Sequence, residues 1–209
     1  MHDHWKPYYT LKGVLHALCN AHHLRELKAL VEIEKEDWAR MMQGLLRCAC
    51  HATNLARERG VALKPGLIAL TERRYDLILA QGFVFQEAQP ALIPAEVKAR
   101  RRGRLPRGVG HNLLLRLDTR KQDMLRFLTD PLVPFTNNLA ECDGRMMKLP
   151  QKISGGFRSE DGAKEFGAIR LLLSTARKQG RDVLSALTSE PHRLIADLRV
   201  VWTGQLPGQ

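Results

Sequence analysis

The apolar residues between Leu24 and Leu55 recur at the spacing of an α-helix, and this pattern constrains the fold more than any other feature of the chain. Glu, Lys and Arg residues lie between them, as expected for the solvent-facing side of a helix. The pattern predicts one long amphipathic helix or two stacked helices, ended by Gly60 and Pro65-Gly66. The residues expected on the buried face are Leu24, Leu27, Val31, Trp38, Met41, Leu45, Ala49, Ala52 and Leu55.

Later segments carry helical signals of the same kind. Leu67–Gln81 and Leu113–Leu128 are apolar at helical spacing. Ser159 is a favourable N-cap, and the acids after it suit the positive end of a helix dipole. Asp182 predicts a last short helix over Val183–Thr188.

A short apolar run at Val14–Cys19 predicts a buried strand. It lies between turn-forming residues, because Lys12-Gly13 precedes it and Asn20 follows it. A short buried helix fits the same residues, since a run of this length has no diagnostic period.

Length and charge limit the class of protein. A chain of 209 residues can bury one core, or one core with a helical appendage. The net charge of +11 favours a polyanionic partner, most simply nucleic acid. No apolar run approaches the ~20 residues that span a bilayer, so no membrane partner is expected. Four unevenly spaced cysteines and no signal-peptide pattern favour the cytoplasm, and the charge favours association with the nucleoid.

A dense cationic run lies at Lys98–Arg107, where six of ten residues are Lys or Arg. One interpretation is a solvated helix end or loop. The other is an arm that contacts DNA phosphates without reading bases. The candidate contacts are Lys98, Arg100, Arg101, Arg102 and Arg104.

The stretch Val133–Arg158 combines one carboxylate with several cations. Glu141 stands at the start of an expected helix, and an acid among cations suits a site where a metal ion meets a phosphate. Asn138 and Glu141 also fit an N-cap followed by an acid at the third helical position. The cations that follow are Arg145, Lys148, Lys152 and Arg158.

Asn137–Glu141 reads Asn-Asn-x-Ala-Glu, and the patterns Arg-x-x-Lys and Lys-x-Ser-Gly-Gly-Phe-Arg-Ser follow it. This order resembles the end of the catalytic domain in the insertion-sequence-66 family of bacterial transposases. Together, the matching blocks span most of the chain in the family's order. The further matching blocks are His2–Tyr8, Cys19–Arg25, Gly162-Ala163 and Ser174–Gly180.

The resemblance implies a catalytic site of two aspartates and a glutamate on a ribonuclease-H-like core. Asp3 is similar to the second aspartate and Glu141 to the glutamate, so both are expected to bind Mg²⁺ or Mn²⁺ in the full-length enzyme. Arg25 is expected to reach the active site or DNA.

The fold class expected from the resemblance is α+β and mostly helical. It comprises a partial ribonuclease-H-like core with a truncated sheet, a long helical insertion and C-terminal helices. The expected divisions are a core remnant over 1–23, a helical insertion with a basic linker over 24–130, a glutamate-bearing helix with C-terminal helices over 131–190, and a tail over 191–209.

The chain departs from the family's pattern in two respects. No residue matches the first aspartate, and Cys142 stands where arginine is usual. The expectation is therefore the C-terminal part of a transposase, inactive alone, which cuts and joins DNA strands in the full-length enzyme. Its expected partners are DNA at element ends and target, and either further copies of itself or an N-terminal half. The alternative is a DNA-binding remnant or a regulator of transposition without catalysis.

A zinc site is a competing interpretation of the cysteines and histidines. Structural zinc is bound by Cys and His in close pairs, which this chain has at two places. If one straight helix carried both pairs, they would lie about 40 Å apart, so only a helical hairpin would bring them together. The residues concerned are Cys19, His22 and His23, with Cys48, Cys50 and His51.

Overall fold

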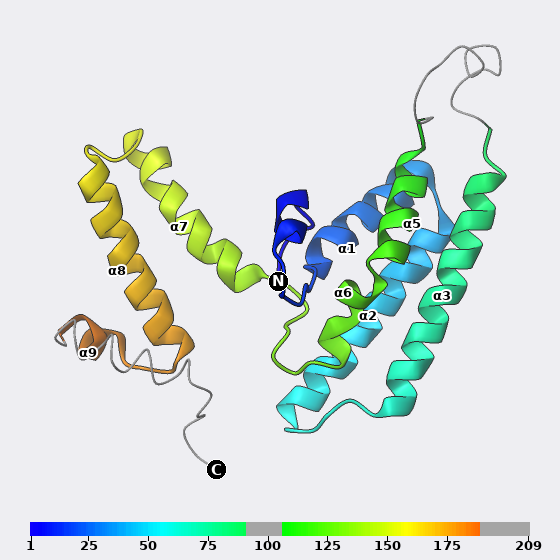
Figure 1. Cartoon of the computed structure of the whole chain (residues 1–209), viewed down its shortest axis with the longest axis horizontal. Helices are drawn as coiled ribbons and strands as arrows, with labels where there is room; N and C mark the ends of the chain where they lie inside the picture. Colours follow the sequence, from blue (N-terminus) through cyan, green and yellow to red (C-terminus); the bar gives the residue numbers. More distant parts are fainter. Residues whose placement is uncertain (91–105, 189–209) are drawn as a thin grey trace. The chain divides into compact units, whose positions relative to one another are not determined.

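A computed structural model describes residues 1–90 and 106–188 of the chain. The chain divides into two compact units, Met1–Asn137 and Asn138–Gln209 (Figure 1). We call them unit 1 and unit 2 and describe each by itself. No helix of the described part is long and apolar enough to cross a membrane.

Unit 1 is built from helices that pack side by side. Helix α2 contacts α1 and α3, and α3 also contacts α5 (Figure 1). The elements in chain order are η1 (Lys6–Thr10), α1 (Asn20–Ala29), η2 (Leu30–Glu34), α2 (Asp37–Glu58), α3 (Pro65–Glu87), α5 (Val109–Thr119), α6 (Lys121–Leu125) and η3 (Arg126–Leu128).

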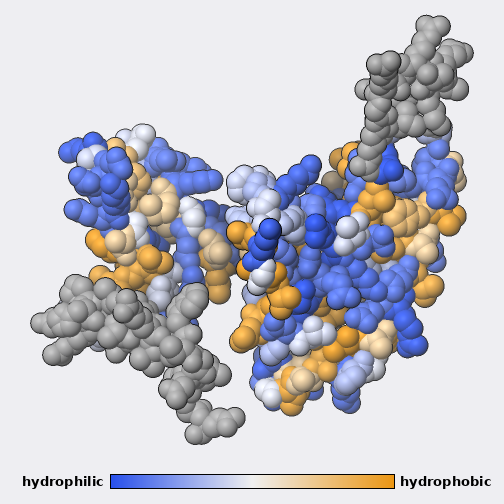
Figure 2. Space-filling model, in the orientation of Figure 1, coloured by the Kyte–Doolittle hydropathy of each residue, from blue (hydrophilic) through white to orange (hydrophobic). Residues whose placement is uncertain are grey.

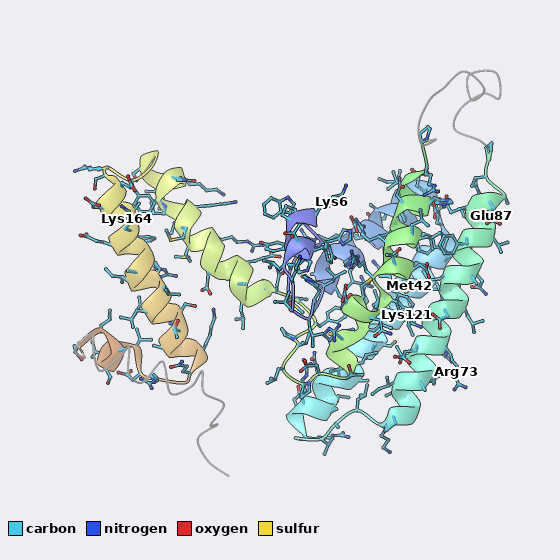
Figure 3. The ribbon with its side chains drawn as sticks, in the orientation of Figure 1. Lys6, Met42, Arg73, Glu87, Lys121 and Lys164 are labelled. Carbon is cyan, nitrogen blue, oxygen red and sulfur yellow. The ribbon has the colours of Figure 1, made fainter. Side chains whose placement is uncertain are left out.

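The core of unit 1 lies between these helices, and Figure 3 shows Met42 among them. Met42, Leu46 and Leu114 are fully buried. Tyr75 of α3 is buried as well, and its hydroxyl donates to the Leu117 carbonyl of α5 over 2.9 Å. Hydrophilic side chains cover most of the visible outer face (Figure 2). Hydrophobic burial therefore holds the unit together, as the helical periodicity predicted.

The long helical pattern from Leu24 to Leu55 forms two helices, with a break between them. The break consists of the π-helical turn η2 and of Lys35, whose φ of 57° is left-handed. A turn of this kind changes the rotation of the chain about the helix axis. The buried stripe on α2 runs through Met42 and Leu46, while Met41 is 43% exposed, so the predicted position of Met41 in the core is wrong.

The predicted sheet is wrong. The described residues contain no strand, and Val14–Cys19 is an extended segment with one isolated parallel bridge between His2 and Leu18. Leu15 is 80% exposed, so the run is not a buried strand. A single bridge cannot form the ladder that a ribonuclease-H-like core requires. The fold class is helical, and the partial ribonuclease-H-like core is overturned.

Unit 2 contains three described helices, α7 (Asn138–Ser154), α8 (Glu160–Lys178) and α9 (Val183–Thr188). Ser159 caps α8, because its hydroxyl accepts a hydrogen bond from the Gly162 N–H over 3.0 Å. Asp182 accepts from the Ser185 N–H over 2.7 Å and so caps α9. These bonds confirm both predicted caps.

Candidate functional site

One face of helix α7 carries Glu141 and three of the predicted DNA-binding cations. At 3.6 residues per turn, Glu141, Arg145, Lys148 and Lys152 fall within an arc of about 60°. The three cations are exposed. We call these four residues the α7 stripe.

The opposite face of α7 packs on α8. Asp143 accepts a hydrogen bond from Ser174 over 2.8 Å and pairs with Lys178. Gly167 of α8 lies against the tip of Met147. Asp143 and Met147 project about 170° and about 130° from the centre of the α7 stripe, by the same helical geometry. Packing within unit 2 therefore directs the α7 stripe away from α8.

Glu141 lies in the first turn of α7, where the helix dipole favours a negative charge. Its carboxylate accepts a hydrogen bond from Arg145 over 3.2 Å, one turn along the helix. The Glu141 side chain is 26% exposed and that of Arg145 is 69% exposed. A pair at this spacing, with one partner exposed, contributes on the order of 0.5 kcal/mol, so it costs little to break. Arg145 can therefore exchange this partner for a phosphate.

The turn after α7 brings Arg158 to the surface. Gly155 and Gly156 have φ values of 77° and 151°, which favour glycine over other residues. Arg158 follows them and is exposed, directly before the Ser159 cap. The two glycines thus separate α7 from α8.

Hydrogen bonds hold the backbone on both sides of Asp3. The His2 N–H donates to the Ala17 carbonyl over 3.0 Å, and the Cys19 N–H donates to the His2 carbonyl over 2.9 Å. On the other side, the His4 N–H donates to His2 Nδ1 over 3.2 Å, and His4 has a left-handed φ of 73°. The Asp3 carboxylate is exposed and accepts a hydrogen bond from the Trp5 N–H over 3.3 Å. Hydrogen bonds therefore restrain the backbone on both sides of Asp3.

Aromatic rings and cations surround this segment. His4 Nδ1 lies 2.8 Å from the Tyr9 hydroxyl, and the Arg120 guanidinium lies 3.8 Å from the centre of the Tyr9 ring. Burial, followed by the charges of Arg116 and Arg120, lowers the pKa of His4 to about 4. His4 is therefore neutral at pH 7 and does not add to the positive charge near Asp3.

The first turn of α1 forms a buried polar cluster. Asn20 donates to the Met124 carbonyl over 3.0 Å, and His23 Nδ1 lies 3.2 Å from the Cys19 carbonyl. Burial, followed by the charge of Arg116, lowers the pKa of His23 to about 4. Arg25 is exposed on the same helix and contacts His22 over 2.9 Å. Sequence reasoning identified this block by its resemblance, but not the burial of Asn20 and His23.

One arginine of α2 holds the segment that follows η3. Arg57 Nη2 donates to the carbonyls of Phe127, Asp130 and Val133, at 3.2, 3.4 and 2.6 Å. Further on, the Asn137 N–H donates to Cys19 Sγ over 3.3 Å. These bonds fix the path of the chain to the end of unit 1. No sequence signal marked Arg57.

The described residues do not bring together the two Cys/His pairs of the zinc interpretation. Cys19 is buried in unit 1, whereas Cys48 and Cys50 lie on α2 and Cys48 is exposed. Within the described ranges, Cys48, Cys50 and His51 belong to no group of three ligand atoms close enough to hold a metal ion.

The predicted site residues fall into three sets. Asp3 and Arg25 belong to unit 1, and the α7 stripe and Arg158 belong to unit 2. The third set is the basic run, which lies outside the described residues except for its last two positions. Its candidates are Lys98, Arg100, Arg101, Arg102 and Arg104.

Comparison with known proteins defines the class. The model of the family described as "Transposase IS66 family" matches residues 1–165. The chain therefore belongs to the IS66 family of transposases, as the motif order predicted.

One curated relative is the "Uncharacterized protein y4jO" of Sinorhizobium fredii (strain NBRC 101917 / NGR234). It is 38% identical over 68 residues, which cover 32% of this chain and 21% of the relative. The match thus spans about a fifth of the relative's length. No solved structure matches the chain.

Proposed function

We propose that this chain contacts DNA and contributes carboxylates to the metal-dependent cutting and joining of DNA strands in transposition. The observation that carries the proposal is the α7 stripe, in which one carboxylate shares an outward face with three exposed cations. Membership of a transposase family makes DNA the natural polyanion for these cations.

The cations would bind the sugar-phosphate backbone. Exposed Lys and Arg side chains neutralise phosphates and release counterions, which gives affinity without sequence preference. Spacing of three or four residues places successive cations about 5–6 Å apart along α7. That interval is close to the distance between neighbouring phosphates of one strand, so several cations can follow the same strand.

The carboxylates would hold Mg²⁺ or Mn²⁺. Asp3 and Glu141 offer oxygen ligands, which hard divalent ions prefer, and Asp3 is exposed on an anchored backbone. When bound, such ions activate an attacking oxygen and stabilise a leaving oxygen. The protein's own part is to orient the carboxylates and to hold the phosphate backbone through Arg145, Lys148 and Lys152.

A second candidate function is DNA binding without chemistry. Cys142 is exposed on α7, at a position where the family resemblance implies an arginine. Loss of that cation would weaken substrate contacts beside Glu141 while leaving the α7 stripe intact. A remnant or regulator of this kind would still compete for element ends.

The test is a strand-transfer assay with the transposase reconstituted to its family's full length. Glu141→Gln and Asp3→Asn should each abolish Mg²⁺-dependent transfer while the melting temperature stays within about 2 °C, because each amide keeps the size of the side chain but loses the charge. Glu165→Gln, an exposed change on α8, is the control and should leave transfer unchanged. Full transfer by either amide variant would refute the catalytic role and leave DNA binding as the function.

A further inference from the structure

An exposed indole ring stands beside Asp3. Trp5 is 61% exposed, and Tyr8, whose ring centre lies 5.5 Å away at 77° to it, is 40% exposed. A tryptophan in a folded protein is usually far more buried than this. Exposed aromatic rings of this size commonly mark a binding surface.

The two rings belong to an anchored segment. Trp5 precedes the short helix η1, and the Tyr8 N–H donates to the Trp5 carbonyl over 3.1 Å. The Tyr8 ring also lies 4.8 Å from the buried His2 ring. A ligand that stacks on Trp5 therefore need not order this backbone first, which lowers the entropic cost of binding.

The charge around the rings favours an anionic ligand. Lys6 and Lys12 are exposed on the same segment, and Figure 3 shows Lys6 at its outer end. Asp3 is the only acidic residue among positions 1–25. An apolar protein partner would explain the exposed ring but not the lysines, whereas a nucleic acid explains both.

We propose that Trp5, assisted by Tyr8, stacks on an unpaired nucleobase of the DNA substrate. Within a duplex, neighbouring base pairs cover both faces of every base, so only an unpaired or extruded base can stack on a protein ring. Lys6 and Lys12 would bind the phosphates on either side of that base. The inference rests on the proposed function, because it requires DNA as the partner.

The experiment measures binding of the whole chain to two DNA probes. One is a single-stranded oligonucleotide with 2-aminopurine at its centre, and the other is the same sequence as a duplex. Trp5→Ala should weaken single-strand binding about tenfold and abolish the quenching of 2-aminopurine, and Trp5→Phe should keep most of both. Duplex affinity should not change, because duplex binding depends on the cations.

Leu15→Ala is the matched control, since Leu15 is an 80% exposed apolar residue of the same N-terminal region. It should bind both probes like the wild type. Unchanged single-strand binding by Trp5→Ala would overturn base stacking while leaving the DNA-binding function in place. Equal losses in Trp5→Ala and Leu15→Ala would also overturn it, in favour of a general apolar surface. Failure of the wild type to bind either probe would refute stacking and the proposed DNA contact together.

Discussion

Ser174 of α8 donates a hydrogen bond to Asp143 of α7 over 2.8 Å. Lys178, one turn further along α8, pairs with the other carboxylate oxygen. These two contacts set the rotation of α7 about its own axis. Because Asp143 lies nearly opposite the α7 stripe, its contacts decide which face of α7 points away from α8.

Asp143→Asn should therefore loosen the contact between α7 and α8. The hydrogen bonds from Lys178 and Ser174 hold the pKa of the Asp143 carboxyl below its usual value. A depressed pKa stabilises the fold above about pH 4, and the contribution is lost as the pH falls through the folded value. The protection factors of α7 amides, which are corrected for the intrinsic pH dependence of exchange, should fall between pH 5 and pH 3 more steeply in the wild type than in Asp143→Asn. Asp161→Asn, which changes an exposed acid of α8, should keep the wild-type profile.

His23 predicts a second pH dependence, in unit 1. Burial lowers the pKa of His23 from 6.5 to about 4. Between these two pH values, His23 is therefore protonated in the unfolded chain and neutral in the folded chain. Stability should fall as the pH drops from 6.5 towards 4, by a total on the order of 3 kcal/mol. Urea unfolding across this range should show a shallower decline in His23→Gln. The exposed His51→Gln should follow the wild type, and an identical decline in His23→Gln would show that another group titrates.

Gly82 should not tolerate a side chain. A Cβ at this position of α3 would lie 2.6 Å from Leu114 and 3.0 Å from Trp38, both fully or almost fully buried. Overpacking should outweigh the better helix propensity of alanine, for a net loss of about 1–2 kcal/mol in urea unfolding. Gly44→Ala on α2 meets no atom within 4 Å and should instead gain up to ~1 kcal/mol. A gain at both positions would mean that the contact between α3 and α5 is looser than described.

Arg57→Met should free the segment after η3. The guanidinium donates to three backbone carbonyls, so its loss leaves acceptors without their charged donor. We expect about 2 kcal/mol of destabilisation and faster amide exchange around Val133. Arg47→Met, at an exposed position of the same helix, should change stability by less than ~0.5 kcal/mol. If both variants lost the same stability, the loss would come from removing a positive charge from α2 and not from breaking the hydrogen bonds to the carbonyls.

The sequence predicted the helices well because each has an apolar stripe or a cap of its own. Ser159 and Asp182 act within three residues, so local pattern was sufficient to place α8 and α9. The segment Val14–Cys19 was assigned wrongly, because a short apolar run has no period to distinguish a strand from an irregular segment. Met41 was misplaced for a different reason, since Met41 and Met42 are adjacent apolar residues and the spacing alone does not show which of them is buried.

The sequence did not predict the side-chain contacts that orient the site, because they join residues far apart in the chain. Asp143 and Ser174 are 31 positions apart, and Arg57 and Val133 are 76 apart. Their pairing depends on tertiary packing, which one sequence does not reveal. The α7 stripe was recognisable as a set of charges, but its direction away from α8 follows from the contacts of Asp143 and Met147.

Salt titration of DNA binding tests the central claim, that the α7 stripe binds phosphates, most directly. The triple variant Arg145→Gln, Lys148→Gln, Lys152→Gln should bind duplex DNA more weakly, with a slope of log affinity against log salt reduced by about 2 to 3. The control triple Lys28→Gln, Arg40→Gln, Lys164→Gln removes the same charge from side chains that are 62, 65 and 66% exposed and paired within their own helical segments. Its slope should match that of the wild type. Equal reductions in both triples would contradict the claim, because net charge rather than the α7 stripe would then govern binding.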